Sequence, residues 1–107
     1  MIHIGCTEDH SFLFPYAAED VSSLFVTYQQ NGVTVLEKTL SDCTIEDGRL
    51  FVTLSREETL QLQQLAAVRM QISGCLMDGT DFISDVVRTV TGEYLRGADA
   101  EEGGIDS

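Results

Sequence analysis

A chain of 107 residues, 43% hydrophobic and 22% charged, has the size and composition of one globular domain. Eighteen Asp and Glu against six Lys and Arg give a net charge of −12, which disfavours binding to nucleic acid or to an anionic membrane surface. No apolar run approaches the roughly 18 residues of a membrane span, and the first residues lack the pattern of a signal peptide. We therefore expect a protein that is cytoplasmic when made.

The first twenty residues predict two short strands. Ile2 and Ile4 indicate the first strand, and Phe12 and Phe14 indicate a second one that ends before Pro15. The polar residues between them, GCTEDHS, are typical of a turn.

Three dipeptides between β-prone segments predict tight hairpins. Each supplies residues that accept the positive φ of a two-residue type I′ turn. The dipeptides are Asn31-Gly32, Asp47-Gly48 and Asp78-Gly79.

The first two turns fix a predicted register. Around the first turn, Tyr28 would face Val35, and one buried face would carry Leu24, Val26, Tyr28, Val33 and Val35. Phe25 and Leu36 would lie on the opposite face, covered by the N-terminal segment or by a partner. Around the second turn, the predicted pairs are Ile45 with Leu50, Cys43 with Val52, and Glu46 with Arg49.

One short helix is predicted after the second hairpin. Ser55 and Glu58 have the spacing of a capping box, in which each side chain bonds the other residue's backbone amide. The helix would end near Leu62–Leu65, with Leu60 and Leu65 docked on the sheet.

The last hairpin is irregular. The strand before Asp78 alternates cleanly, but the returning strand changes parity, which predicts a bulge near Ser84-Asp85. Residues 1–95 form the expected domain, and residues 96–107 form an expected disordered acidic tail. About six or seven strands at this spacing predict a mainly β antiparallel sandwich or small barrel.

The residues offer weak candidates for chemistry. Asp78, Asp81 and Asp85 would bind a divalent cation only weakly and are better explained as a solvated turn and strand face. A triad built on His10 with one Ser and one Asp is a chance arrangement. Cys6, Cys43 and Cys75 are expected to stay free thiols, because they are odd in number and widely spaced. The expected catalytic, metal and cofactor sites are therefore none.

A resemblance to a known class extends over Val21–Leu95. The segments VTYQQNGVTVLEK, VTLSREET and VRMQISGCLMDG occur in an order that resembles short prophage-encoded proteins of Firmicutes. The match looks like the N-terminal immunoglobulin-like module of phage baseplate and tail accessory proteins. The resemblance implies an antiparallel immunoglobulin-like β-sandwich, no catalytic residues and possible association with a virion.

These observations predict a non-enzymatic structural or interaction module of a phage or prophage particle. Its partner would be a phage structural protein, or a second copy joined through an edge strand around Thr34–Thr39 or Ile2–Ile4. Lys38 is the only lysine available to protect an edge. The alternative is a free-standing module that binds a sugar, through Tyr16 or Tyr94, or calcium. A small hydrolase ranks third.

Overall fold

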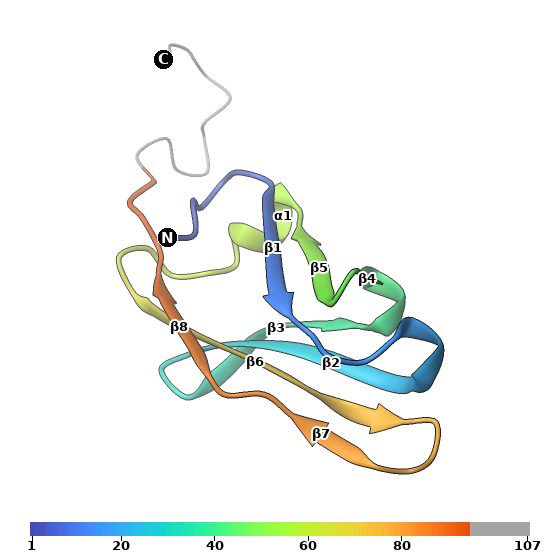
Figure 1. The fold of residues 1–107 in the computed structure, drawn as a ribbon. Coiled ribbons are helices and arrows are strands. Elements are labelled where there is room, and N and C mark those ends of the chain that lie inside the picture. Colours follow the sequence, from blue (N-terminus) through green and yellow to red (C-terminus); the bar gives the residue numbers. More distant parts are fainter. Residues whose placement is uncertain (95–107) are drawn as a thin grey trace.

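The computed structural model describes residues 1–94, which form two antiparallel sheets joined by short turns (Figure 1). The smaller sheet has the order β1-β5-β4, with β1 at Glu8–Leu13, β5 at Arg49–Leu54 and β4 at Cys43–Glu46. In the larger sheet, β6 pairs on one side with β2, and β2 with β3; on its other side, β6 pairs with both β7 and β8. Its strands are β2 (Val21–Gln30), β3 (Val33–Thr39), β6 (Ala67–Leu76), β7 (Asp81–Ile83) and β8 (Val87–Val90).

This pairing confirms the predicted mainly β antiparallel sandwich and gives it an immunoglobulin-like strand order. An immunoglobulin sandwich pairs strand B with E and E with D in one sheet, and C with F and F with G in the other. Here β1, β5 and β4 take the places of B, E and D, and β2 and β6 take those of C and F. β3 extends the sheet beyond β2, as strand C′ does in variable-type domains.

The place of strand A, beside β1, has no strand within residues 1–94. The predicted strand at Ile2–Ile4 was wrong, because only Ile2 pairs, through a single parallel bridge to Thr91. Both isoleucines are nevertheless buried. The predicted polar turn also ends earlier than expected, because β1 already begins at Glu8.

Two of the three predicted turns have the expected form. Asn31 and Gly32 both have positive φ, as do Asp47 and Gly48, which is what a type I′ turn requires. The third turn was predicted wrongly. Its closing pair is Leu76 and Thr80, which leaves three loop residues, and only Gly79 has positive φ. This is a type I turn followed by a left-handed glycine.

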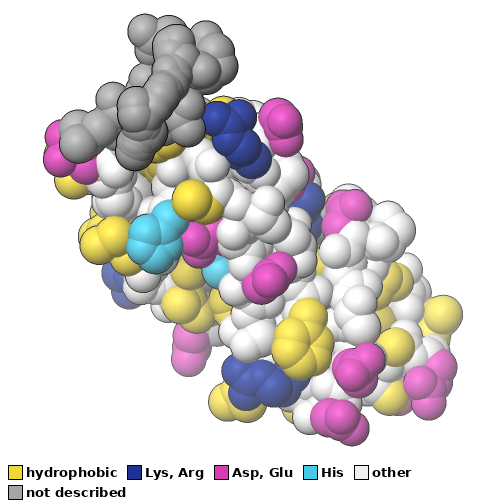
Figure 2. Space-filling model, turned by 90° about the horizontal axis from the view of Figure 1, so that it is seen from above, with side chains coloured by type: hydrophobic (Ala, Val, Ile, Leu, Met, Phe, Trp, Pro, Cys, Tyr) yellow, Lys and Arg dark blue, Asp and Glu magenta, His cyan; other side chains and the backbone are white. Residues whose placement is uncertain are grey.

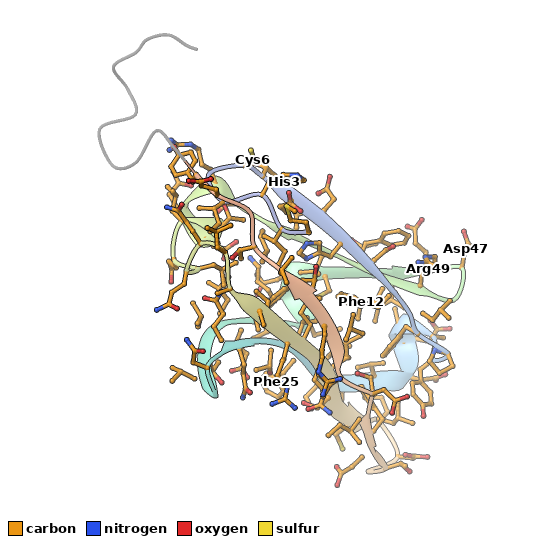
Figure 3. All side chains as sticks on the ribbon, turned by 90° about the vertical axis from the view of Figure 1, so that its left-hand side faces the viewer. His3, Cys6, Phe12, Phe25, Asp47 and Arg49 are labelled. Carbon is orange, nitrogen blue, oxygen red and sulfur yellow. The ribbon has the colours of Figure 1, made fainter. Side chains whose placement is uncertain are left out.

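The second hairpin has the predicted register, and the first has it only next to the turn. There Gln30 faces Val33, but β3 then carries a bulge, so Tyr28 faces Leu36 and Val35 is the extra residue. From Leu36 onward the bulge reverses the predicted faces, and Leu36 is buried. Val33 keeps its pairing with Gln30, but it is 62% exposed beside the turn, so its predicted burial was wrong. Phe25 lies on the outer face of the larger sheet, as predicted (Figure 3).

The helix α1 spans only Arg56–Thr59, and its N-terminus has the predicted capping box between Ser55 and Glu58. The predicted docking residues were wrong, because Leu60 and Leu65 are exposed. Thr59 and Leu62 are buried in their place. Two 3-10 turns, η1 (Ala18–Asp20) and η2 (Leu40–Asp42), connect strands elsewhere.

The predicted bulge in the last strand is present as a break between β7 and β8. Ser84 fills the break, because its hydroxyl accepts a hydrogen bond from the amide of Ile72 and its own amide donates to the Ile72 carbonyl. The predicted tail, residues 96–107, lies outside the described residues.

The core lies between the two sheets. Its members are buried apolar side chains from both sheets and from the segments at each end: Ile2, Ile4, Phe14, Val21, Leu24, Val26, Tyr28, Leu36, Leu50, Val52, Leu54, Leu62, Val68, Met70 and Ile72.

Candidate functional site

An open groove runs along one side of the sandwich, between β1 of the smaller sheet and β8 of the larger one. Figure 3 looks onto this side, where Phe12 lies between the two strands. The volume of the groove is about 810 Å³. We name it the β1–β8 groove; its lining consists of Met1, Ile2, all of β1, Met70, Ile72, Ser84, Asp85 and Val87–Thr89.

The backbone of β1 presents to this groove an edge with which no strand of residues 1–94 pairs. The amide of Phe14 donates to the carbonyl of Gly48, and the register between β1 and β5 is regular. Because hydrogen-bonded pairs alternate in an antiparallel ladder, the even-numbered residues of β1 bond β5. The amides and carbonyls of Asp9, Ser11 and Leu13 therefore point away from β5, into the groove.

The side chains of β1 alternate in the opposite sense. Glu8, His10 and Phe12 are half-buried and face the space between the sheets, whereas the odd-numbered residues are exposed. Figure 2 shows the two histidine side chains close to acidic and hydrophobic ones at this end of the molecule. The groove thus combines an apolar floor, an acidic rim and a free strand edge.

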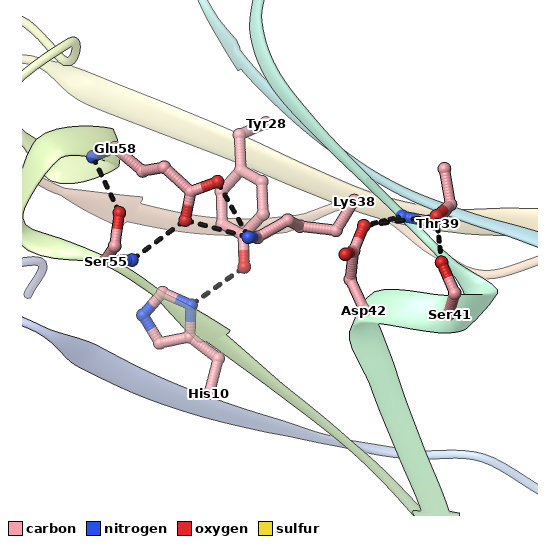
Figure 4. A network of polar contacts seen from close by, with 8 residues as sticks. All are labelled: His10, Tyr28, Lys38, Thr39, Ser41, Asp42, Ser55 and Glu58. Carbon is pink, nitrogen blue, oxygen red and sulfur yellow. Dashed lines mark hydrogen bonds and ion pairs between the residues drawn. The ribbon is translucent and has the colours of Figure 1, made fainter.

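His10 spans the gap between the two sheets. Its Nδ1 lies 2.9 Å from the hydroxyl of Tyr28, a fully buried side chain of β2 (Figure 4). Its Nε2 lies 3.5 Å from Glu8 Oε1. Since a carboxylate only accepts, Nε2 carries the proton and the Tyr28 hydroxyl donates to Nδ1. Both ring nitrogens of His10 are therefore engaged.

Burial sets the titration of this cluster. It lowers the pKa of His10, an effect that the neighbouring Glu8 only partly offsets. Burial also raises the pKa of Tyr28 far above its ordinary value. For Glu8, burial alone would raise the pKa, but hydrogen bonds from the His3 backbone and ring outweigh it and hold the pKa below its usual value. At neutral pH the cluster thus holds a neutral imidazole beside a carboxylate.

The opposite side of the sandwich is closed by an ion pair. Lys38 of β3 points inward, and its Nζ lies 2.7 and 2.8 Å from the two carboxylate oxygens of Glu58 in α1 (Figure 4). Burial alone would raise the pKa of Glu58, but hydrogen bonds from Lys38 and from the Ser55 amide hold it below its usual value. This contact ties the edge of the larger sheet to the end of β5.

The other candidates from the sequence do not form sites. Within residues 1–94, no three His, Cys, Asp or Glu side chains are placed to hold a metal ion, so Asp78, Asp81 and Asp85 do not gather into a cation site. The carboxylate of Asp78 accepts a hydrogen bond from the Thr80 amide, which is a turn-stabilising contact.

The remaining thiol and aromatic candidates have structural surroundings. Cys43 lies in β4, where burial raises the pKa of its thiol to about 11. Cys75 lies in β6, and Cys6 is exposed. Tyr16 packs on the rings of Phe14 and Phe82, with centroids 5.6 and 5.3 Å away, and the Tyr94 hydroxyl accepts from Arg56.

Sequence reasoning missed the β1–β8 groove. One feature of the sequence pointed to a missing strand beside β1. Ile2 and Ile4 are apolar, but too few residues lie between them and Glu8 to form a strand of the length found in a sandwich.

Within residues 1–94, no helix is long and apolar enough to cross a membrane.

Comparison with known proteins adds one structural likeness. No family model matches the chain, and no curated protein matches it. A solved structure of the V domain of amphioxus IgVJ-C2 is similar, with 11% sequence identity and a TM-score of 0.35. The match covers 85% of this chain and 97% of that one.

Proposed function

We propose that this chain is a non-enzymatic module that acts through protein–protein contacts, of the kind that belongs to a phage baseplate or tail. The observation that carries the binding role is the free edge of β1 along the β1–β8 groove. The phage context is supported only by the sequence resemblance over Val21–Leu95.

The state of the reactive side chains supports binding rather than chemistry. His10 has both ring nitrogens engaged, and Tyr28, which donates to it, is buried. The raised pKa of Cys43 keeps its thiol protonated, and therefore weakly nucleophilic, at neutral pH. An interaction module needs none of these groups to be free.

Site-specific photocrosslinking tests the proposal. A benzophenone amino acid would replace Leu13, an exposed residue on the groove rim, and in a matched variant Leu60, an exposed residue outside the groove lining. Irradiation in cells that carry the surrounding phage genes should crosslink the Leu13 variant, and not the Leu60 variant, to another protein.

The crosslinked product separates the two parts of the proposal. A phage structural protein would support both parts. A different protein would overturn the phage context alone. Equal crosslinking of the two variants, or none, would overturn the binding role of the groove.

A further inference from the structure

We propose that the β1–β8 groove accepts an extended segment of another protein, bearing Lys or Arg, as an added strand antiparallel to β1. This inference rests on the proposed function and names its partner. The added segment would take the place of strand A in an immunoglobulin sandwich.

The first residues of the chain define the path of that strand. The amide of Ile2 donates to the Val90 carbonyl at 2.8 Å, and the Gly92 amide donates to the Ile2 carbonyl at 3.0 Å. This is parallel pairing with the end of β8. A segment that continued this path ahead of Met1 would run along β8 toward Val87, through the groove.

The direction of that path matches the free edge of β1. Figure 1 shows β1 and β8 running in opposite directions, so a segment parallel to β8 is antiparallel to β1. The amides and carbonyls of Asp9, Ser11 and Leu13 would then form its ladder. Alternate side chains of the segment would enter the space beside Phe12, Met70 and Ile72.

The edge of β1 is less protected than the edge of β3. Natural sheets blunt an edge with bulges and with charged residues that point inward. β3 has both devices, the bulge at Val35 and the inward Lys38. β1 has one inward charged residue, Glu8 at its first position, and its register has no bulge over Glu8–Leu13. A regular edge that pairs with no strand among residues 1–94 is suited to pairing with another strand.

Charge selects the occupant. The groove lining carries three carboxylates, Glu8, Asp9 and Asp85, against two cations, Arg88 and the N-terminal ammonium of Met1, and the pKa of His10 keeps its ring neutral at pH 7. A second copy of this chain, with a net charge of −12, would add repulsion, and residues 96–107 carry four acids against one Arg. A segment with Lys or Arg at its outward positions would instead face Asp9.

An N-terminal extension tests the site at high effective concentration, because the extension is already placed at the mouth of the groove. Ile2 is buried and Met1 is exposed, so every second residue counted back from Ile2 faces inward along this path. The extended chain therefore carries VKVTVKV directly ahead of Met1, with both lysines at outward positions. Matched controls carry VEVTVEV, which reverses the charge, and GSGSGSG, which has no strand propensity. All three extensions have the same length.

The VKVTVKV chain should melt at least about 4 °C above the unextended chain, and the GSGSGSG chain should not. The amides of Ser11 and Leu13 should become strongly protected from hydrogen exchange in the VKVTVKV chain, more weakly in the VEVTVEV chain, and not in the GSGSGSG chain. Unchanged exchange at Ser11 in the VKVTVKV chain would overturn strand addition. Equal protection by the two charged extensions would overturn the preference for a basic segment.

Two further outcomes would assign the groove to another occupant. If the Ser11 amide is already protected in the unextended chain and loses protection when residues 95–107 are removed, the C-terminal segment fills the groove. If protection rises with concentration together with a dimer in light scattering, a second copy fills it. Either result overturns this inference, whereas the crosslinking test of the interaction module stands or falls on its own.

Discussion

The β3 side and the β1 side of this sandwich differ in how the two sheets meet at their edges. On the β3 side, a bulge turns the edge strand, and Lys38 crosses from β3 to Glu58 beside β5. On the β1 side, the sheets are joined through His10 and Tyr28, the edge of β1 is regular and pairs with no strand of residues 1–94, and a groove remains open. One side is thus closed by an ion pair, and the other keeps the groove to which we assign the proposed binding role.

The largest expected effect tests which backbone groups of the β1 sheet are paired. Ser11 and Phe51 face each other across β1 and β5, but the Phe51 amide belongs to the ladder with β4 and the Ser11 amide points into the groove. Phe51→Pro should lower the free energy of unfolding by about 3 kcal/mol or more, because it removes a ladder hydrogen bond. Ser11→Pro should cost about 1 kcal/mol or less.

Urea denaturation of the two proline variants measures this difference. Comparable losses of stability in both would mean that the Ser11 amide is paired and that the edge of β1 is not free.

On the open side, the next effect comes from the Tyr28 hydroxyl. Tyr28→Phe removes the only donor to His10 Nδ1 among the described contacts, and leaves a half-buried nitrogen without a partner. The free energy of unfolding should fall by about 1–2 kcal/mol. Tyr16→Phe is the matched control and should change stability by less than about 0.5 kcal/mol, because Tyr16 contributes through ring packing. Equal effects of the two substitutions on the melting temperature would show that the Tyr28 hydroxyl does not stabilise the fold through His10.

On the closed side, the Lys38–Glu58 pair should show a measurable coupling. A double-mutant cycle with Lys38→Met and Glu58→Gln should give a coupling free energy of about 1 kcal/mol, because both side chains are mostly buried and the contact is bidentate. The coupling should persist in moderate salt. A coupling free energy near zero would mean that the ion pair does not stabilise this side of the sandwich.

The two sides should also differ in their response to acid. His10 has a lowered pKa in the folded state, so its contribution to stability is present above its unfolded pKa, about 6.5, and is lost as the pH falls through the folded value. Glu58 has a lowered pKa, so its contribution is present above about 4.5 and is lost at lower pH. Stability should therefore fall in two steps.

Urea midpoints measured from pH 7.5 to pH 3 would resolve the two steps. His10→Gln should remove the upper step and keep the lower one, and Glu58→Gln should weaken the lower one. An upper step that survives in His10→Gln would assign it to another group.

Local chemistry explains what the sequence predicted well. Asn31-Gly32 and Asp47-Gly48 have turn geometry that two residues can specify, and Ser55 with Glu58 forms a cap within one helical turn. The second hairpin register followed directly from its turn.

Long-range contacts explain what it predicted poorly. The prediction placed Val33 and Val35 on the buried face of the first hairpin. In the structure, the buried side chain at the end of this hairpin is Gln30, which makes two hydrogen bonds with the backbone of Gln63, 33 residues away. The bulge at Val35 then places Leu36 in the core. The groove could not be predicted, because it depends on which strand pairs with β1 and on how β8 lies opposite it.

Amide hydrogen exchange in the unextended chain tests the central claim most directly. The account predicts alternation along β1: the amides of His10 and Phe12 are protected by β5, and the amides of Ser11 and Leu13 exchange at least about a hundredfold faster. Because the alternation lies within one strand, the amides of His10 and Phe12 serve as internal controls for those of Ser11 and Leu13. Uniform protection from Glu8 to Leu13 would mean that the edge is already covered and would contradict the account.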